Sequence, residues 1–305
     1  MLGLTLTVLL VLTSSHSWAQ QLKERIYSDI GDVRPCFRRM NSTHQIGCSS
    51  KTGGNVGVLI YLESVEEFEK LEDNEFAPYI LLVDPYIFSS TLLETFQSSG
   101  LVAGVLLPSV DGGRWDGHYP SQGYSDDNSC PSPGLADNRA DCDTKNPWNP
   151  SGQATMWTDW DFPIFYLENN TLAEQIYSCY AEHNTMTSLS WPLCSMELTS
   201  DMFGSTDSAT CLRRSSLFSI SPVRLCDPLS DDNIHHFLSP RLQAEDQDSV
   251  IVVAAKMDAL TLFDQLEAGF DSPASGIVTL LSVAHTVSRA VSKNPQYRQV
   301  FTVTM

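Results

Sequence analysis

The segment Val56–Pro108, VGVLIYLESVEEFEKLEDNEFAPYILLVDPYIFSSTLLETFQSSGLVAGVLLP, determines the fold class of this 305-residue chain. Three apolar runs in it, Val56–Leu62, Tyr79–Val83 and Leu101–Leu107, are separated by two polar stretches of helical length. Apolar strands that alternate with helices are typical of a parallel sheet covered by helices. The segment therefore predicts an α/β fold with a mostly parallel sheet.

Helix starts can be placed from capping patterns, in which Ser or Thr is followed three residues later by Glu. Gly100 stands where the second helix should end, as expected of a residue that adopts a left-handed conformation. Two patterns, Ser64 with Glu67 and Thr91 with Glu94, begin the helices that separate the three apolar runs. A third, Thr171 with Glu174, begins a further helix that should reach His183.

A second strand–helix–strand unit follows in the C-terminal part. We expect a buried strand at Val250–Ala255, a helix from Pro273 to about Val291 and a strand from Gln299 onward. Asp227–Asp248 is a polar connector, and the boundary between two lobes is expected within or near it. The chain stops inside the last expected strand, at Met305, which we interpret as an incomplete sequence.

Residues 109–155 form a long segment rich in Gly, Pro, Asp, Asn and Ser that separates the strands of the first unit. It contains Cys130, Cys142 and Trp148. Long loops without regular structure are usually functional or disordered, and the two cysteines argue against simple disorder.

The first 19 residues predict a secretory signal. Leu2–Leu12 is apolar but too short to cross a bilayer, and Ser17–Ala19 has small residues at the usual cleavage spacing. An apolar N-terminal strand is the alternative. A signal places the mature chain in the lumen of the secretory pathway and at the cell surface, where disulfides persist. No later apolar run is long enough for a transmembrane helix.

Eight cysteines fit that compartment. They allow 105 pairings, among which the sequence does not choose. Neighbouring pairs would close loops of about 15 residues, each stabilised by roughly 3 kcal/mol, so local pairing is favoured. The neighbours are Cys36/Cys48, Cys130/Cys142, Cys179/Cys194 and Cys211/Cys226.

A net charge of −19 argues against nucleic acid as a partner. Two sequons, at Asn41 and Asn169, predict glycosylated surface in a secreted chain.

The stretch Val250–Gly276 resembles the active-site frame of zinc aminopeptidases with paired metals. Those enzymes have a His-x-Asp after the strand and a bridging Asp before the following helix. Lys256 occupies the His position here, Ser272 the bridging position, and Asp258 remains. An ammonium does not bind zinc and a hydroxyl replaces a bridging carboxylate poorly. We therefore expect neither a metal, nor another cofactor, nor hydrolysis.

Other candidate groups have simpler interpretations. The adjacent His235 and His236 are expected in a surface loop, and His285 as a buried residue of the apolar helix. Arg213 and Arg214 are expected on a solvated face.

Four motifs resemble the nicastrin family, in order and at similar spacing along the mature chain. They are THQIGC after Cys36, at Thr43–Cys48, FPIF at Phe162–Phe165, CLRRSS at Cys211–Ser216 and CDPLSD at Cys226–Asp231. The resemblance implies a non-catalytic subunit of gamma-secretase, an intramembrane aspartyl protease. Implied partners are a presenilin-type catalytic subunit, the other subunits, and type I membrane protein substrates such as Notch and the amyloid precursor.

The resemblance also implies a two-lobed ectodomain. Residues 20–240 would form the small lobe with sequential disulfides, and 241–305 the start of an aminopeptidase-like large lobe. The loop at 109–155 would be a lid, with Trp148 as its tryptophan, and Phe263 would pack near the contact between the lobes. A secreted zinc aminopeptidase-like hydrolase and a soluble binding module are the alternative functions.

Overall fold

A computed structural model places the secondary structure of most of the chain. It describes residues 27–31, 33–40, 45–71, 75–117, 153–185, 193–203, 207–215, 218, 220, 226, 232–237, 250–258, 261–263, 273–293 and 300–304. The strands are β1 Val33–Pro35, β2 Arg38–Met40, β3 Gln45–Gly47, β4 Asn55–Leu62, β5 Tyr79–Val83, β6 Val102–Pro108, β7 Ile164–Leu167, β8 Ser195–Leu198, β9 His235–Phe237, β10 Val250–Ala254 and β11 Val300–Thr304. The helices are α2 Val65–Glu69, α3 Ser90–Ser99, α4 Asn170–His183, α5 Ser208–Ser215 and α6 Ser275–Lys293, with short 3₁₀ turns η1 Gly113–Trp115, η2 Thr155–Trp157 and η3 Asp201–Phe203.

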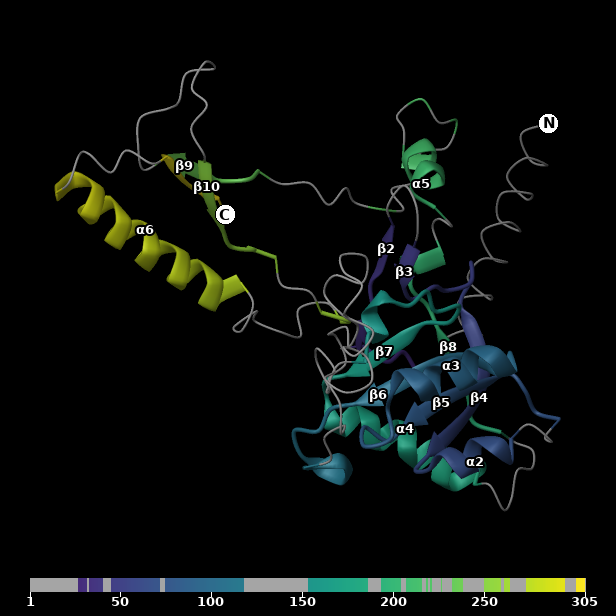
Figure 1. Ribbon diagram of the computed structural model, residues 1–305. Coiled ribbons are helices and arrows are strands. Elements are labelled where there is room, and N and C mark those ends of the chain that lie inside the picture. The colour runs from purple at the N-terminus through teal and green to yellow at the C-terminus, as the bar shows by residue number, and fades with distance from the viewer. Residues whose placement is uncertain are drawn as a thin grey trace, which may run out of the picture. The chain divides into compact units, whose positions relative to one another are not determined.

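The predicted parallel sheet is confirmed. Among the described residues it has the strand order β1-β7-β6-β5-β4-β8 (Figure 1). The strands β4, β5, β6 and β7 pair in parallel, each with the next along the chain. β8 joins the outer side of β4 antiparallel, with Asn55 opposite Leu198. The fold is therefore α/β, as the alternation of strands and helices in Val56–Pro108 predicts.

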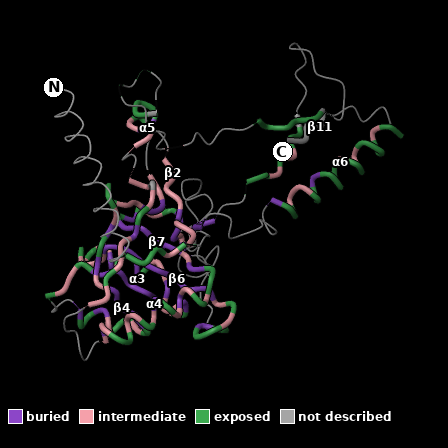
Figure 2. Tube along the Cα trace, turned by 180° about the vertical axis from the view of Figure 1, so that it is seen from behind, coloured by how far each residue is buried: buried purple, intermediate pink, exposed green. Residues whose placement is uncertain are grey.

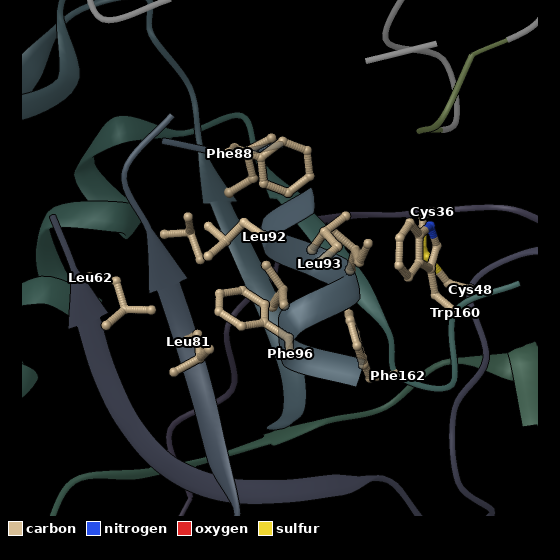
Figure 3. Packing of buried hydrophobic residues seen from close by; sticks show 14 of the residues in the cluster. Cys36, Cys48, Leu62, Leu81, Phe88, Leu92, Leu93, Phe96, Trp160 and Phe162 are labelled. Carbon is tan, nitrogen blue, oxygen red and sulfur yellow. A yellow bond between two sulfur atoms is a disulfide. The ribbon is translucent and has the colours of Figure 1, made fainter. Parts of the chain in front are cut away.

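Both faces of this sheet are covered because successive strand residues point to opposite sides. Leu62 and Leu81 face α3, whose Leu92, Leu93 and Phe96 are buried against them (Figure 3). On the other face, the ring of Tyr61 contacts Tyr177 of α4 edge-on, with centroids 5.1 Å apart. β5 lies between these layers, and all five of its residues are buried.

The helix boundaries correct part of the capping prediction. The N-cap of α3 is Ser89, whose Oγ accepts the amide of Leu92, so the helix begins before the Thr91–Glu94 pattern. Asn169 caps α4 by accepting the amide of Thr171. Gly100 ends α3 with φ +67°, as predicted. Short polar residues compete for the cap when several stand in a row, which is why the pattern fixes it only to within two residues.

Disulfides join three of the neighbouring cysteine pairs in the described part of the chain: Cys36–Cys48, Cys179–Cys194 and Cys211–Cys226. The buried indole of Trp160 lies beside the first (Figure 3), and its Nε1 donates to the carbonyl of Thr155.

Two backbone hydrogen bonds join Gly47 to the same region. The amide of Gly47 donates to the carbonyl of Thr158, and the carbonyl of Gly47 accepts the amide of Trp160. A Cβ at Gly47, where φ is +86°, would overlap the carbonyl of Phe37. This close approach requires glycine.

The Cys179–Cys194 loop is fixed to the sheet by one buried side chain. The Nδ2 of Asn184 donates to the carbonyls of Leu59 and Cys194, at 2.7 and 2.6 Å, and its Oδ1 accepts the amide of Cys194 at 2.9 Å. Asn184 is fully buried and follows the last residue of α4. It therefore satisfies backbone groups that would otherwise be buried without partners.

A separate sheet has the order β10-β11-β9. β10 and β11 are parallel, with Val250 opposite Val300, and α6 connects them in sequence. The predicted strand–helix–strand unit is thus confirmed. The prediction that its first strand is buried is wrong. Ile251 is 43% and Val252 59% exposed.

Helix α6 is also largely exposed. Its apolar residues Val278, Leu281 and Val283 are accessible, and Figure 2 colours most of the helix as intermediate or exposed. His285, expected to be buried, is exposed as well. Leu280 is buried, so only part of the apolar face is covered. Apolar periodicity identifies the helix, but the extent of burial depends on a second surface that periodicity does not describe.

Two segments for which the sequence indicates no helix or strand contain regular structure. The region between Cys194 and Cys226 includes β8 and α5, and the polar connector includes β9. β8, β9 and α5 are too short to recognise from local sequence alone, and the strands are identified only by the strands that they pair with. In the part of the chain that the structure describes, no helix is long and apolar enough to span a bilayer.

Replacing Asn184 by Leu should lower the free energy of unfolding by about 2–4 kcal/mol, because the carbonyl of Leu59 and the amide of Cys194 lose their partner, while the carbonyl of Cys194 keeps only the amide of Leu59. Chemical denaturation followed by tryptophan fluorescence measures this change. Gln175→Leu, on the exposed side of α4, is the matched control and should change stability by less than about 0.5 kcal/mol. Equal stability of the Asn184 variant and the control would contradict the structural role of Asn184.

Candidate functional site

The strand end at Lys256 and the start of α6 lie next to each other, as the metallopeptidase frame requires. A Cβ placed on Gly276 would lie 3.6 Å from the Cβ of Ala255. Lys256, Met257 and Asp258 are exposed, and Ser272 lies outside the described residues. Among the residues that the structure places, no three His, Cys, Asp or Glu side chains are grouped closely enough to hold a metal ion.

Asp258 has a cation as its electrostatic neighbour. Burial lowers the pKa of Arg39 in β2 below its ordinary value, and the negative charge of Asp258 opposes that shift. The Arg39 guanidinium also lies 5.2 Å from the centroid of the Phe37 ring. The carboxylate that the frame retains thus interacts electrostatically with an arginine of β2, which suits a structural role.

Phe263 is buried against the same region. It forms an antiparallel bridge with Cys36, and the amide of Phe37 donates to the carbonyl of Leu262 at 3.1 Å. The Phe263 ring is 1% exposed and lies 5.5 Å from that of Tyr166 in β7. Residues 261–263 therefore add a short strand-like segment beside β1.

A hydroxyl fixes the turn of this segment. Thr261 Oγ1 donates to the carbonyl of Phe263 at 2.8 Å and accepts its amide at 3.2 Å. The cavity next to it, lined by Phe37, Met156 and Leu262 among others, measures about 10 Å³. Such a volume holds roughly one water molecule, so the segment is packed closely and leaves no room for an organic ligand.

Polar and aromatic groups gather where the parallel strands end. The Tyr61 hydroxyl donates to Asp84 Oδ2 at 3.1 Å, and burial, together with Asp84, raises the pKa of Tyr61 above its ordinary value. The indole of Trp115 in η1 is fully buried, 6.3 Å from the Tyr61 ring. This cluster closes the carboxyl end of β4 with packed aromatic side chains and the carboxylate of Asp84.

The first residues of the expected lid are anchored on α4. The Arg114 guanidinium lies 3.6 Å from the centroid of the Tyr177 ring and 3.8 Å from Glu174 Oε2. The Arg114 amide donates to Glu174 Oε1, and Asn170 Nδ2 donates to the carbonyl of Gly112. Glu174, which the sequence assigns to a helix cap, instead holds this loop.

The sequence does not reveal the Arg114–Tyr177 contact, because a long segment rich in Gly, Pro and Asp and the strand β7 separate the two residues along the chain. The two residues meet only when β6 and β7 pair, which local patterns do not encode. Of the predicted site residues, the structure places Phe263, Asn169, Lys256 and six of the eight cysteines. Cys130, Cys142, Trp148, Asn41 and the signal segment lie outside the described residues.

An α/β small lobe, followed by the first strand–helix–strand unit of a second lobe, defines a class of two-lobed ectodomains. Sequence models of the nicastrin small lobe and the nicastrin large lobe match residues 35–204 and 249–305. The chain belongs to the nicastrin family.

Individual relatives agree with this assignment. Nicastrin of Homo sapiens is 32% identical over 304 residues, which cover 92% of this chain and 41% of the relative. Nicastrin of Dictyostelium purpureum is 28% identical over 302 residues, which cover 97% of this chain and 42% of the relative. The chain thus spans about two fifths of the length of these curated relatives.

A solved structure is similar in fold. The crystal structure of the gamma-secretase component Nicastrin aligns with a TM-score of 0.60 and 26% sequence identity, over 92% of this chain and 44% of that one. The α/β fold with a small lobe and the start of a large lobe is therefore that of the family.

Phe263→Ala should release residues 261–263 from the small-lobe segment, because it removes the buried ring that packs on Tyr166. Amide hydrogen exchange at Phe37, which donates to Leu262, should accelerate at least about tenfold. The amide of Cys36, which donates to Ile164 within the sheet, should keep its protection. Met257→Ala, at an exposed position of the same loop, is the control. Unchanged exchange at Phe37 in the Phe263 variant would show that the segment is held by other contacts.

Proposed function

We propose that this protein is a non-catalytic subunit of gamma-secretase that admits type I membrane protein stubs to the protease and stabilises the complex. The observation that carries the proposal is membership of the nicastrin family, whose matched segments cover both lobes. A solved relative is described as a gamma-secretase component. The partners proposed are a presenilin-type catalytic subunit and the remaining subunits, with substrates such as Notch and the amyloid precursor.

Lys256 supports a non-catalytic role. It follows β10, next to the start of α6, where paired-zinc aminopeptidases have a histidine ligand. A protonated amine repels a cation, and the adjacent Asp258 is engaged electrostatically with Arg39 rather than with a histidine. A frame that keeps its strand and helix without a ligand at this position is suited to binding or support rather than to hydrolysis.

The proposed organisation has a signal at 1–19, a small lobe at 20–240 with a lid at about 109–155, and a large lobe that begins at 241. The proposed boundary at 241 is compatible with the two matched segments, which end at 204 and resume at 249. The buried Phe263 and the anchored Arg114 support contacts of a large-lobe loop and of the lid with the small lobe. In this proposal the ectodomain lies in the secretory lumen and at the cell surface, and it favours short stubs by steric exclusion.

Deletion of the gene that encodes this chain should abolish assembly of the protease complex and cause uncleaved type I stubs to accumulate. Immunoblots of stub and product, with native electrophoresis of the complex, measure both effects. Re-expression should restore them, and re-expression of Lys256→Gln should do so equally, because no step requires that amine. Normal processing in the deleted cells would overturn the proposal. Stoichiometric zinc in the purified protein, with release of amino acids from amino-acid amides, would establish the aminopeptidase alternative.

Asn169 fits a glycosylation site as well as a helix cap. Its side chain is exposed, and Oδ1 accepts the amide of Thr171 at 2.9 Å. A glycan would be attached at Nδ2, which leaves the capping oxygen in place. The sequon at Asn41 is proposed as a second site.

The Asn169 site can be tested without disturbing the cap. Thr171→Ala removes the sequon, whereas Thr171→Ser preserves it, and both retain Asn169 Oδ1 as the acceptor. The Ala variant should migrate faster by one glycan on denaturing gels, and the Ser variant should migrate with the wild type. All three should migrate alike after enzymatic deglycosylation. Identical migration of the Ala variant and the wild type before that treatment would show that Asn169 carries no glycan.

A further inference from the structure

We draw no further inference here: the strongest candidate, the exposed apolar side chains Val278, Leu281 and Val283 on helix α6, carries no proposal, because nothing in the described part of the structure shows what covers them.

Discussion

The complete burial of β5 is the constraint on which the small-lobe fold depends. All five of its residues are buried, and it forms parallel pairs with β4 on one side and β6 on the other. A parallel strand of this kind is stable only when helices cover both faces of the sheet, because no residue can turn toward water. α3 covers one face, and α4 contacts the opposite face through Tyr177. The chain must therefore cross the sheet after β7, and this crossing brings β8 to the outer side of β4.

That crossing has a cost in buried backbone groups, which Asn184 and the Cys179–Cys194 disulfide offset. Asn184 ends α4 and binds both Leu59 in β4 and Cys194 before β8. The disulfide joins the helix to the same turn. One side chain and one covalent bond thus replace the ladder contacts that a longer β8 would make. The same connection leaves the Arg114 loop free to pack on α4 rather than on the sheet.

Local sequence determines the elements of this protein much better than it determines what covers them. The strands in Val56–Pro108 and the helices that separate them were predictable because their apolar runs and turns are both local. Gly100 likewise identifies its own helix end. β10 and α6 were equally recognisable, yet Ile251 and His285 are exposed, since burial depends on a surface that local periodicity does not describe. The Asp258–Arg39 and Arg114–Glu174 contacts were not predictable because each joins elements brought together only by strand pairing.

The residues from Lys256 to Phe263 follow the strand that resembles the metal-ligand strand of paired-zinc aminopeptidases, and those that the structure describes make structural contacts. The first of them are exposed at the end of β10, and the last are buried beside β1. In a metal site the residues after this strand would have to face the start of α6, so the loop would be constrained by its ligands. With Lys256 in place of a ligand that constraint is lifted, and Phe263 can be used to bury area against Tyr166. The energy that ligand binding would supply to order the loop comes here from an aromatic side chain, the hydroxyl of Thr261, which donates to the carbonyl of Phe263, the backbone hydrogen bond from Phe37 to Leu262, and the charge of Arg39.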